Sequence, residues 1–153
     1  MPTLRPARES DVETLLGLQR IYYAEDGYPF VEPRARASWT QLLTNAALGR
    51  VWVVVDADDI VGYVVLTLGF SLEFGGRDAF VDELFVSPAH RGRGYGAAAL
   101  DAAEAGCVDL GVGALHLEVE RDKTRTQEFY RRRGFVDHDR YLMTKWFVRR
   151  AAL

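Results

Sequence analysis

The first fifty residues carry apolar positions at helical spacing, interrupted by turn residues. Ser10 and Glu13 have the spacing of a capping box at the start of the first run, so we expect a helix from there to Gly27. A second helix is expected over residues 32–48, and Gly49 is expected to close it. The beginning of the chain is therefore predicted to be largely helical.

The pattern then changes to that of strands. β-Branched and aromatic residues dominate 51–56 and 60–70, and the polar turn between these runs predicts a hairpin. Further strands are expected at 3–7, 79–86, 114–120, 135–138 and 141–147. Further helices are expected at 94–110 and 124–133, the latter opened by a Thr124–Gln127 capping box. This order predicts one α/β domain over residues 1–153, with a mixed layer structure.

Size and composition narrow the class of protein. A chain of 153 residues suits one domain with one sizeable core. The formal net charge of -3 argues against a broad nucleic-acid surface, which needs a basic footprint. Cys107 is the only cysteine, and no apolar run approaches 18 residues, so we expect a cytoplasmic protein without a membrane span. The three histidines lack metal-ligand spacing, and no metal is expected.

The most informative segment is 81–97, where a predicted strand enters a loop with three alternate glycines that opens a helix. Glycines allow close backbone approach to a ligand, and the free N–H groups of a helix start favour an anion. Arg91 and Arg93 add positive charge. Residue chemistry alone therefore indicates a pyrophosphate cradle.

Other nucleotide-binding loops fit this segment less well. The Gly-Lys-Ser/Thr sequence of a P-loop is absent. Gly92, Gly94 and Ala97 formally match the dinucleotide-binding pattern, and Glu118 lies near its expected acidic position. However, residues 87–91 separate the first glycine from its strand, and too little chain remains for a doubly wound sheet. A glycine-rich surface loop without function is the remaining alternative.

The segment resembles a known family. Arg91-x-x-Gly94-x-Gly96 after Leu84-Phe85-Val86 is similar to the acetyl-CoA signature of the GNAT N-acetyltransferases. A second segment, Phe129 to Phe135, resembles the tyrosine and glycine-aromatic segment of that family. The resemblance implies the GNAT fold over the whole chain, with six to seven strands and about four helices. It is greatest to the small-amine and diamine acetyltransferases.

The resemblance also implies which residues bind acetyl-CoA. In the family, strands corresponding to those near Val86 and Val119 splay apart and admit the pantetheine arm. Lys123 departs from the asparagine that many relatives have there. The implied cofactor-binding residues are Leu84, Phe85, Val86, Arg91, Gly92, Arg93, Gly94, Tyr95, Gly96, Ala97, Lys123 and Tyr130.

Acetyl transfer to an amine requires a neutral nucleophile. A lysine-like amine has a pKa near 10.4, so neutralising it at pH 7 costs roughly 4–5 kcal/mol, and a positioned carboxylate can accept the proton. The candidates are Asp82, Glu83 and Glu118. Strand alternation predicts that Asp82 and Glu83 point to opposite faces. By resemblance, Tyr130 is the acid that meets the leaving sulfur.

The end of the first helix is expected to shape the acceptor pocket. Carboxylates and aromatic rings gather there, which suits a small cationic amine. A protein N-terminus or lysine is the alternative acceptor, and a non-catalytic acyl-CoA-binding module is the alternative function. A homodimer is one option, with the last strand, around 142–147, taking part. The candidate pocket residues are Tyr22, Tyr23, Glu25, Asp26 and Tyr28.

Overall fold

The structure is a computed structural model that describes residues 1–148. The described chain forms two compact units, one over Met1–His116 and one from Leu117 onward. The sheet and three of the four described α-helices belong to the first unit. The boundary falls directly after the last strand, so each unit is described by itself.

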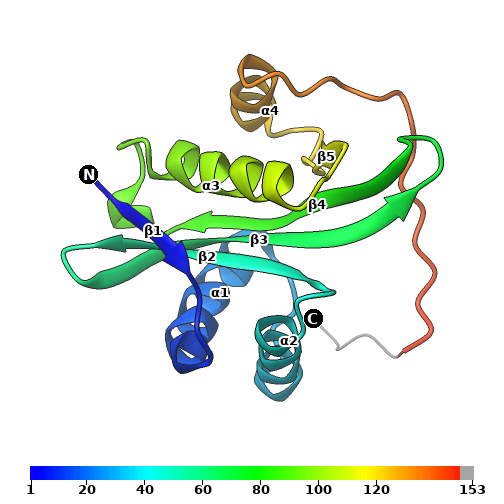
Figure 1. The fold of residues 1–153 in the computed structure, drawn as a ribbon. Helices are drawn as coiled ribbons and strands as arrows, with labels where there is room; N and C mark the ends of the chain where they lie inside the picture. Colours follow the sequence, from blue (N-terminus) through cyan, green and yellow to red (C-terminus); the bar gives the residue numbers. More distant parts are fainter. Residues whose placement is uncertain (149–153) are drawn as a thin grey trace. The chain divides into compact units, whose positions relative to one another are not determined.

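The first unit is built on one mixed sheet (Figure 1). Its strands follow one another in chain order, and neighbours are antiparallel except for the parallel last pair. Within residues 1–148 the sheet has five strands, so the expected six to seven was too many. The strands are β1 (Thr3–Pro6), β2 (Gly49–Asp56), β3 (Asp59–Ser71), β4 (Gly76–Val86) and β5 (Ala114–His116).

The predicted hairpin is present as β2 and β3. Ala57 and Asp58 form its two-residue turn with φ values of 48° and 71°, the left-handed geometry that matches strand twist. β4 begins three residues earlier than expected, whereas β5 ends at His116, four residues before its predicted end. The long β3–β4 pairing positions the segment that carries the candidate chemistry.

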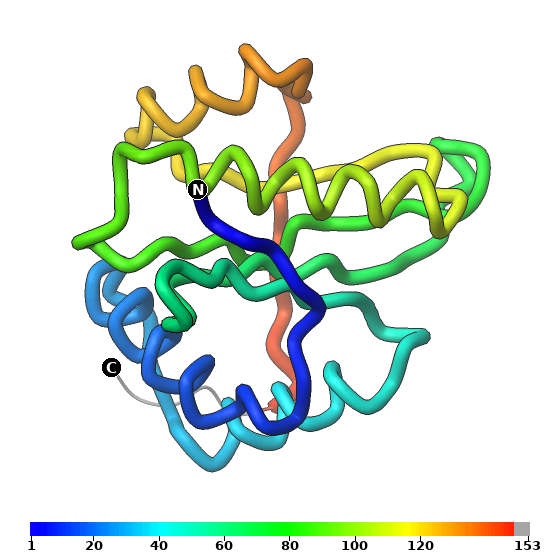
Figure 2. Tube along the Cα trace, turned by 60° about the vertical axis from the view of Figure 1, so that its left-hand side comes forward, coloured from blue at the N-terminus to red at the C-terminus, as the bar shows by residue number. Residues whose placement is uncertain are grey.

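Helices cover both faces of this sheet. α1 (Val12–Asp26) and α2 (Glu32–Thr44) pack on one face, and α3 (Tyr95–Asp109) packs on the other (Figures 1 and 2). The first face holds a large apolar core that includes Leu15 and Trp39. The unit is therefore a three-layer α/β structure, as the element order predicts.

Close packing fixes α3 on its face of the sheet. A Cβ added at Gly106 would lie 2.5 Å from the ring of Trp52, so only glycine lets the helix approach the strand this closely. Cys107, one residue on, is buried against Leu66 and Ala79. Burial raises the pKa of its thiol, as is typical of an inert packed cysteine.

Two helix boundaries differ from the sequence predictions. The start of α1 does not use Ser10 and Glu13; instead the Asp11 carboxylate accepts the Arg8 backbone N–H at 2.7 Å, ahead of a short 3-10 turn. The end of α2 comes at Thr44, four residues before residue 48, because Asn45 is already extended. Gly27 does end α1, as predicted, and it has the left-handed conformation common at helix ends.

The second unit contains α4 (Thr124–Arg132) and no strand among its described residues. The predicted Thr124–Gln127 capping box is wrong, because no side chain caps α4 and the Gln127 amide binds backbone carbonyls. The predicted strands 135–138 and 141–147 are also wrong: β-propensity needs a ladder partner, and these residues have none within the described chain.

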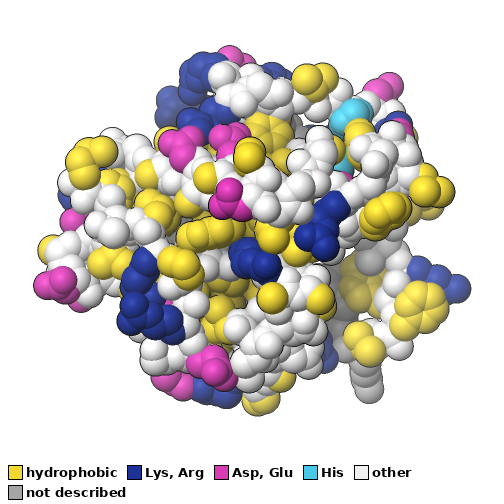
Figure 3. All heavy atoms as spheres, viewed as in Figure 1, with side chains coloured by type: hydrophobic (Ala, Val, Ile, Leu, Met, Phe, Trp, Pro, Cys, Tyr) yellow, Lys and Arg dark blue, Asp and Glu magenta, His cyan; other side chains and the backbone are white. Residues whose placement is uncertain are grey.

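The end of the described chain exposes large apolar side chains. Leu142 and Phe147 are 72% and 90% exposed, and the predicted last strand around 142–147 does not form. On the face seen in Figure 3, basic and acidic side chains are scattered among apolar ones.

No helix among residues 1–148 is long and apolar enough to cross a membrane.

Candidate active site

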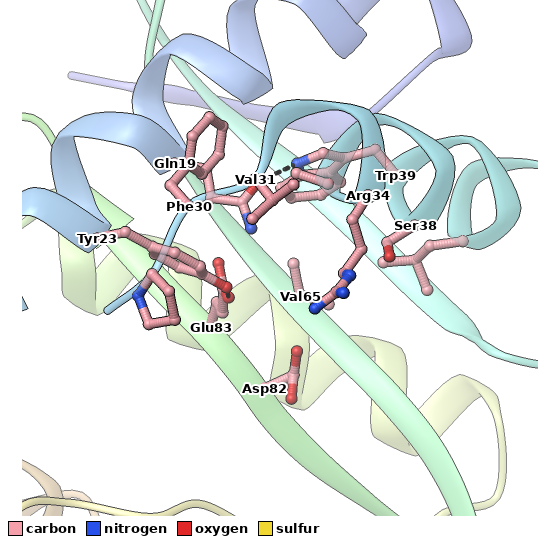
Figure 4. Close-up of a pocket in the computed structure, with 13 residues that line it drawn as sticks. Gln19, Tyr23, Phe30, Val31, Arg34, Ser38, Trp39, Val65, Asp82 and Glu83 are labelled. Atoms are coloured by element: carbon pink, nitrogen blue, oxygen red, sulfur yellow. Dashed lines mark hydrogen bonds between the residues drawn. The ribbon is translucent and has the colours of Figure 1, made fainter. Parts of the chain in front are cut away.

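A cavity of about 280 Å³ lies in the first unit, between the α1–α2 layer and the sheet (Figure 4). Its wall combines apolar and aromatic side chains with two carboxylates and one guanidinium, the composition of a small-molecule site. The lining residues are Gln19, Tyr23, Pro29, Phe30, Val31, Arg34, Ala35, Ser38, Trp39, Leu42, Val65, Asp82 and Glu83.

Glu83 is the most firmly held group of this wall. The Tyr23 hydroxyl donates to one of its carboxylate oxygens at 2.5 Å, and the Tyr63 hydroxyl donates to the other at 2.7 Å. Burial raises the pKa of Glu83, and the two phenol hydrogen bonds oppose that rise. Burial and the neighbouring carboxylate also raise the pKa of both phenols, so they remain donors.

A buried amide extends this network toward α2. The Trp39 indole N–H donates to the Gln19 side-chain oxygen at 2.7 Å (Figure 4). Gln19 also hydrogen-bonds the Tyr23 phenol, which opposes the rise in the pKa of Tyr23. Helices α1 and α2 and strands β3 and β4 thus all contribute to fixing one carboxylate. A connected and satisfied polar network of this kind holds a single arrangement.

Asp82 lies beside Glu83 on the same cavity wall, so the prediction that they point to opposite faces is wrong. The reason is a β-bulge: Val65 pairs with Glu83 and Leu66 pairs with Val81, which leaves Asp82 without a partner in the ladder. Part of the Asp82 side chain meets solvent, yet the surrounding protein limits its hydration and raises the pKa of its carboxyl.

The glycine loop follows β4 through a short 3-10 turn, Pro88–His90. Gly92 and Gly94 have φ values of 75° and 82°, so both positions require glycine. A Cβ added at either of them, or at Gly96, would meet no atom within 4 Å. No side chain among residues 1–148 caps the N-terminus of α3. The loop therefore presents open space and backbone donors at a helix start, which fits a diphosphate.

The Arg91 side chain turns back toward the first helix. Its Nε donates to the Val86 carbonyl, and its terminal nitrogen donates to Glu25, both at 2.8 Å. The guanidinium also lies 5.4 Å from the centre of the Phe85 ring. Arg91 therefore ties the loop to β4 and α1, whereas Arg93 is exposed on the loop.

Side chains within and behind the loop hold its shape. Ser87 Oγ lies 2.7 Å from His90 Nδ1, and the buried Tyr95 hydroxyl donates to Asp56 at 2.9 Å. Tyr95 thus anchors the start of α3 to the β2–β3 hairpin. Gly96 and Ala97 follow in the first turn of the helix and are half-buried.

Strand β4 runs beyond its parallel neighbour. The β4–β5 ladder joins three residue pairs and ends at Phe80 and His116, whereas β4 continues to Val86. Phe85 is buried in the core, and Leu84 and Val86 are half-buried. Beyond Phe80, β4 has no ladder partner on the β5 side among the described residues. This is the segment that the resemblance assigns to the pantetheine arm.

Of the predicted acceptor residues, only Tyr23 lines the cavity. Tyr22 stacks on Phe85 at 5.4 Å between ring centres, and Tyr28 packs edge-on against Tyr23 at 5.5 Å. Glu25 pairs with Arg91, and Asp26 is half-buried at the end of α1. The cavity therefore extends from the end of α1 toward α2.

Sequence reasoning missed four residues of the site: Gln19, Arg34, Trp39 and Tyr63. Their local pattern is that of an ordinary amphipathic helix and a buried strand. A weak signal was present, because buried tryptophan, tyrosine and glutamine side chains require hydrogen-bond partners.

Three predicted residues belong to the second unit. Tyr130 lies on α4, where its ring packs edge-on against Phe129 and Phe135, and burial raises the pKa of its phenol. Lys123 immediately precedes α4, and Glu118 is exposed. Among residues 1–148 there is no group of three or more His, Cys, Asp and Glu side chains arranged to hold a metal ion.

The glycine loop after a bulged strand, together with the element order, points to one family. The sequence model of the acetyltransferase (GNAT) family matches residues 15–135. This chain belongs to the GNAT acetyltransferase family. The match covers the cavity, the glycine loop and Tyr130, and it extends from the first unit into the second. None of the curated proteins is significantly similar to the chain in sequence.

Solved structures agree with this assignment. An integron cassette protein from the mobile metagenome of Cole Harbour Salt Marsh is 40% identical, with a TM-score of 0.86, over 95% of this chain and 91% of that one. A predicted acetyltransferase from Clostridium acetobutylicum, solved with acetyl-CoA, is 18% identical with a TM-score of 0.80, covering 95% and 96% of the two chains. An aminoglycoside N-acetyltransferase solved with CoA is 16% identical with a TM-score of 0.82, covering 97% and 96%.

The predicted GNAT fold is confirmed, with fewer strands than expected. The protein is an acyltransferase, and acetyl-CoA is its co-substrate. The predicted pyrophosphate cradle lies in the first unit, where Gly92 and Gly94 have positive φ and open space around them.

Proposed function

We propose that this acetyltransferase transfers the acetyl group of acetyl-CoA to the primary amine of a small molecule that binds in the 280 Å³ cavity. The observation that carries the proposal is the pair of adjacent carboxylates, Asp82 and Glu83, in a wall that also holds apolar and aromatic side chains. Such a wall attracts an ammonium group. The cavity lies at the lower end of the size range of small-molecule sites, which favours a compact acceptor over a protein surface.

The two carboxylates have different roles in this proposal. Glu83 is fixed by two phenols and orients the ammonium group. Asp82 accepts the proton, because it has no hydrogen bond from a described side chain and burial raises its pKa. The Asp82 carboxylate thus leaves the amine neutral and nucleophilic.

The remaining roles rest on the family signature. We propose that backbone N–H groups over residues 91–97 hold the diphosphate of acetyl-CoA, with the Arg91 side chain positioning the loop. Residues 84–86 hold the pantetheine arm, and Lys123 is a further candidate for a phosphate contact. Tyr130 gives its proton to the departing thiolate; the matched segment that contains it supports this role. The carbon–nitrogen bond forms as the carbon–sulfur bond breaks. The whole chain then works as one acetyltransferase domain.

The direct test is acetyl-CoA-dependent release of coenzyme A with a panel of small primary amines and, in parallel, peptides with a free N-terminus or lysine. We expect turnover with small amines and none above background with peptides. Turnover with peptides alone would overturn the small-molecule proposal.

A further inference from the structure

We infer that the acceptor is a zwitterion, a small free amino acid whose carboxylate binds Arg34 while its amino group faces Asp82 and Glu83. This inference rests on the proposed function, because it concerns the second functional group of the molecule that fills the same cavity.

The cavity carries both signs of charge on different walls. Asp82 and Glu83 belong to β4, whereas Arg34 belongs to α2. In Figure 4 the Arg34 side chain extends from α2 across the cavity and its guanidinium is directed toward Asp82. A ligand between these walls meets an anionic and a cationic group at the same time.

A simple amine or diamine would complement only half of this arrangement. An ammonium group beside the carboxylates is attracted, but a second ammonium group near the guanidinium of Arg34 is repelled. A carboxylate is the group that arginine binds best, through two parallel N–H···O bonds that fix its orientation. The guanidinium therefore selects for an acceptor that carries a negative charge close to its amine.

The rest of the cavity wall suits the side chain of an amino acid. Phe30, Val31, Leu42 and Val65 supply apolar surface between the charged walls, and the volume of about 280 Å³ limits the ligand to a compact molecule. An apolar or aromatic amino acid places its charged groups at the two polar walls and its side chain on this surface. An oligosaccharide or a folded protein surface would not fit inside.

The test compares acceptors that differ only in the carboxylate. The pairs are L-phenylalanine with phenethylamine, L-leucine with isoamylamine and L-lysine with cadaverine, each assayed by coenzyme A release. For at least one pair we expect kcat/KM of the amino acid to exceed that of its amine by about tenfold or more, because a charge-assisted bidentate contact is lost in the amine.

The matched variants are Arg34→Gln and Arg36→Gln. Both remove one arginine from α2, but Arg36 pairs with Glu13 and Glu32 and does not line the cavity. Arg34→Gln should lower kcat/KM for the amino acids roughly 10- to 100-fold and leave the amines within a few-fold. Arg36→Gln should leave both classes within a few-fold, and Arg34→Lys should recover part of the loss.

A binding measurement separates the inference from catalysis. N-acetyl-L-phenylalanine and its amide, titrated by calorimetry into the protein with coenzyme A, should differ in affinity only where Arg34 is present. Acetylation of amines without any preference for the amino acids, or equal effects of Arg34→Gln on both classes, would overturn the zwitterion while leaving the proposed function intact. Absence of turnover with every amine and amino acid would overturn both.

Discussion

The two halves of the candidate site are built by opposite means. The glycine loop at residues 92–97 acts through its backbone and keeps open space around its glycines. The cavity wall around Glu83 acts through side chains from four elements that hydrogen-bond one another in the interior. A backbone site tolerates side-chain changes that preserve φ, whereas a side-chain network depends on every member. The difference predicts where substitutions act on cofactor binding and where they act on chemistry.

The largest effect is expected at Asp82. Asp82→Asn keeps the size of the side chain but removes the proton acceptor, so kcat should fall on the order of 10²- to 10⁴-fold. Affinity for acetyl-CoA, measured by calorimetry, should change little. Asp58→Asn in the exposed β2–β3 turn removes the same charge and serves as the control. Full activity in Asp82→Asn would transfer the role of base to Glu83 or Glu118.

The same carboxyl gives a pH signature. The base must be ionised to accept a proton. Because the pKa of Asp82 is raised, kcat/KM of the native enzyme should already decline, as the pH is lowered, at pH values above the ordinary pKa range of aspartate. A pH profile in which kcat/KM declines only at the usual pKa of aspartate would contradict this assignment. The pH profile of stability, measured in parallel, separates loss of ionisation from unfolding.

The next largest effect is expected in the loop. Gly94→Val forces a β-branched residue into a left-handed conformation, at a cost of about 1–2 kcal/mol, and fills the open space before α3. Acetyl-CoA affinity should fall tenfold or more, with little change in kcat at saturating co-substrate. Gly27→Val, also at positive φ but at the end of α1, controls for backbone strain. Equal losses of acetyl-CoA affinity in both variants would show that the loop does not bind the co-substrate.

This contrast also explains what the sequence could predict. The loop was predictable because its information is local: a strand, alternate glycines and a helix stand next to one another in the chain. The cavity was not, because Arg34 reaches it only through the packing of α2, and Tyr63 reaches Glu83 only through the long β3–β4 pairing. The bulge at Asp82 shifts the side-chain period by one residue, and alternation cannot foresee such a shift.

Fold prediction failed in the same way at the end of the chain. Segments 135–138 and 141–147 have the composition of strands, but strand formation depends on a partner that composition does not specify. The predicted hairpin of β2 and β3 succeeded because its two-residue turn and both its strands are contiguous. Contiguous elements were therefore predictable, and distant pairings were not.

A smaller effect is expected in the network around Glu83. Tyr63→Phe removes one donor from a buried carboxylate, so the free energy of unfolding at neutral pH should fall by about 1.5–3 kcal/mol. The lost donor stabilised the charged form, so the variant raises the pKa of Glu83 further. The destabilisation should accordingly shrink as the pH falls below that pKa and Glu83 becomes neutral in both proteins. Tyr141→Phe, on a ring that is 85% exposed, is the control for the denaturation measurements.

The smallest effect is expected where the two halves meet, at the ion pair of Arg91 and Glu25. Both side chains are partly exposed, at 47% and 34%, so their coupling in a double-mutant cycle of Arg91→Gln and Glu25→Gln should be about 0.2–1 kcal/mol. If Arg91 positions the loop through Glu25 and Val86, each single variant should weaken acetyl-CoA binding by a few-fold in the same direction. A tighter complex in Glu25→Gln together with a much weaker one in Arg91→Gln would show instead that Glu25 competes with the diphosphate for the guanidinium. The cycle therefore distinguishes an arginine that supports a backbone site from one that binds the anion itself.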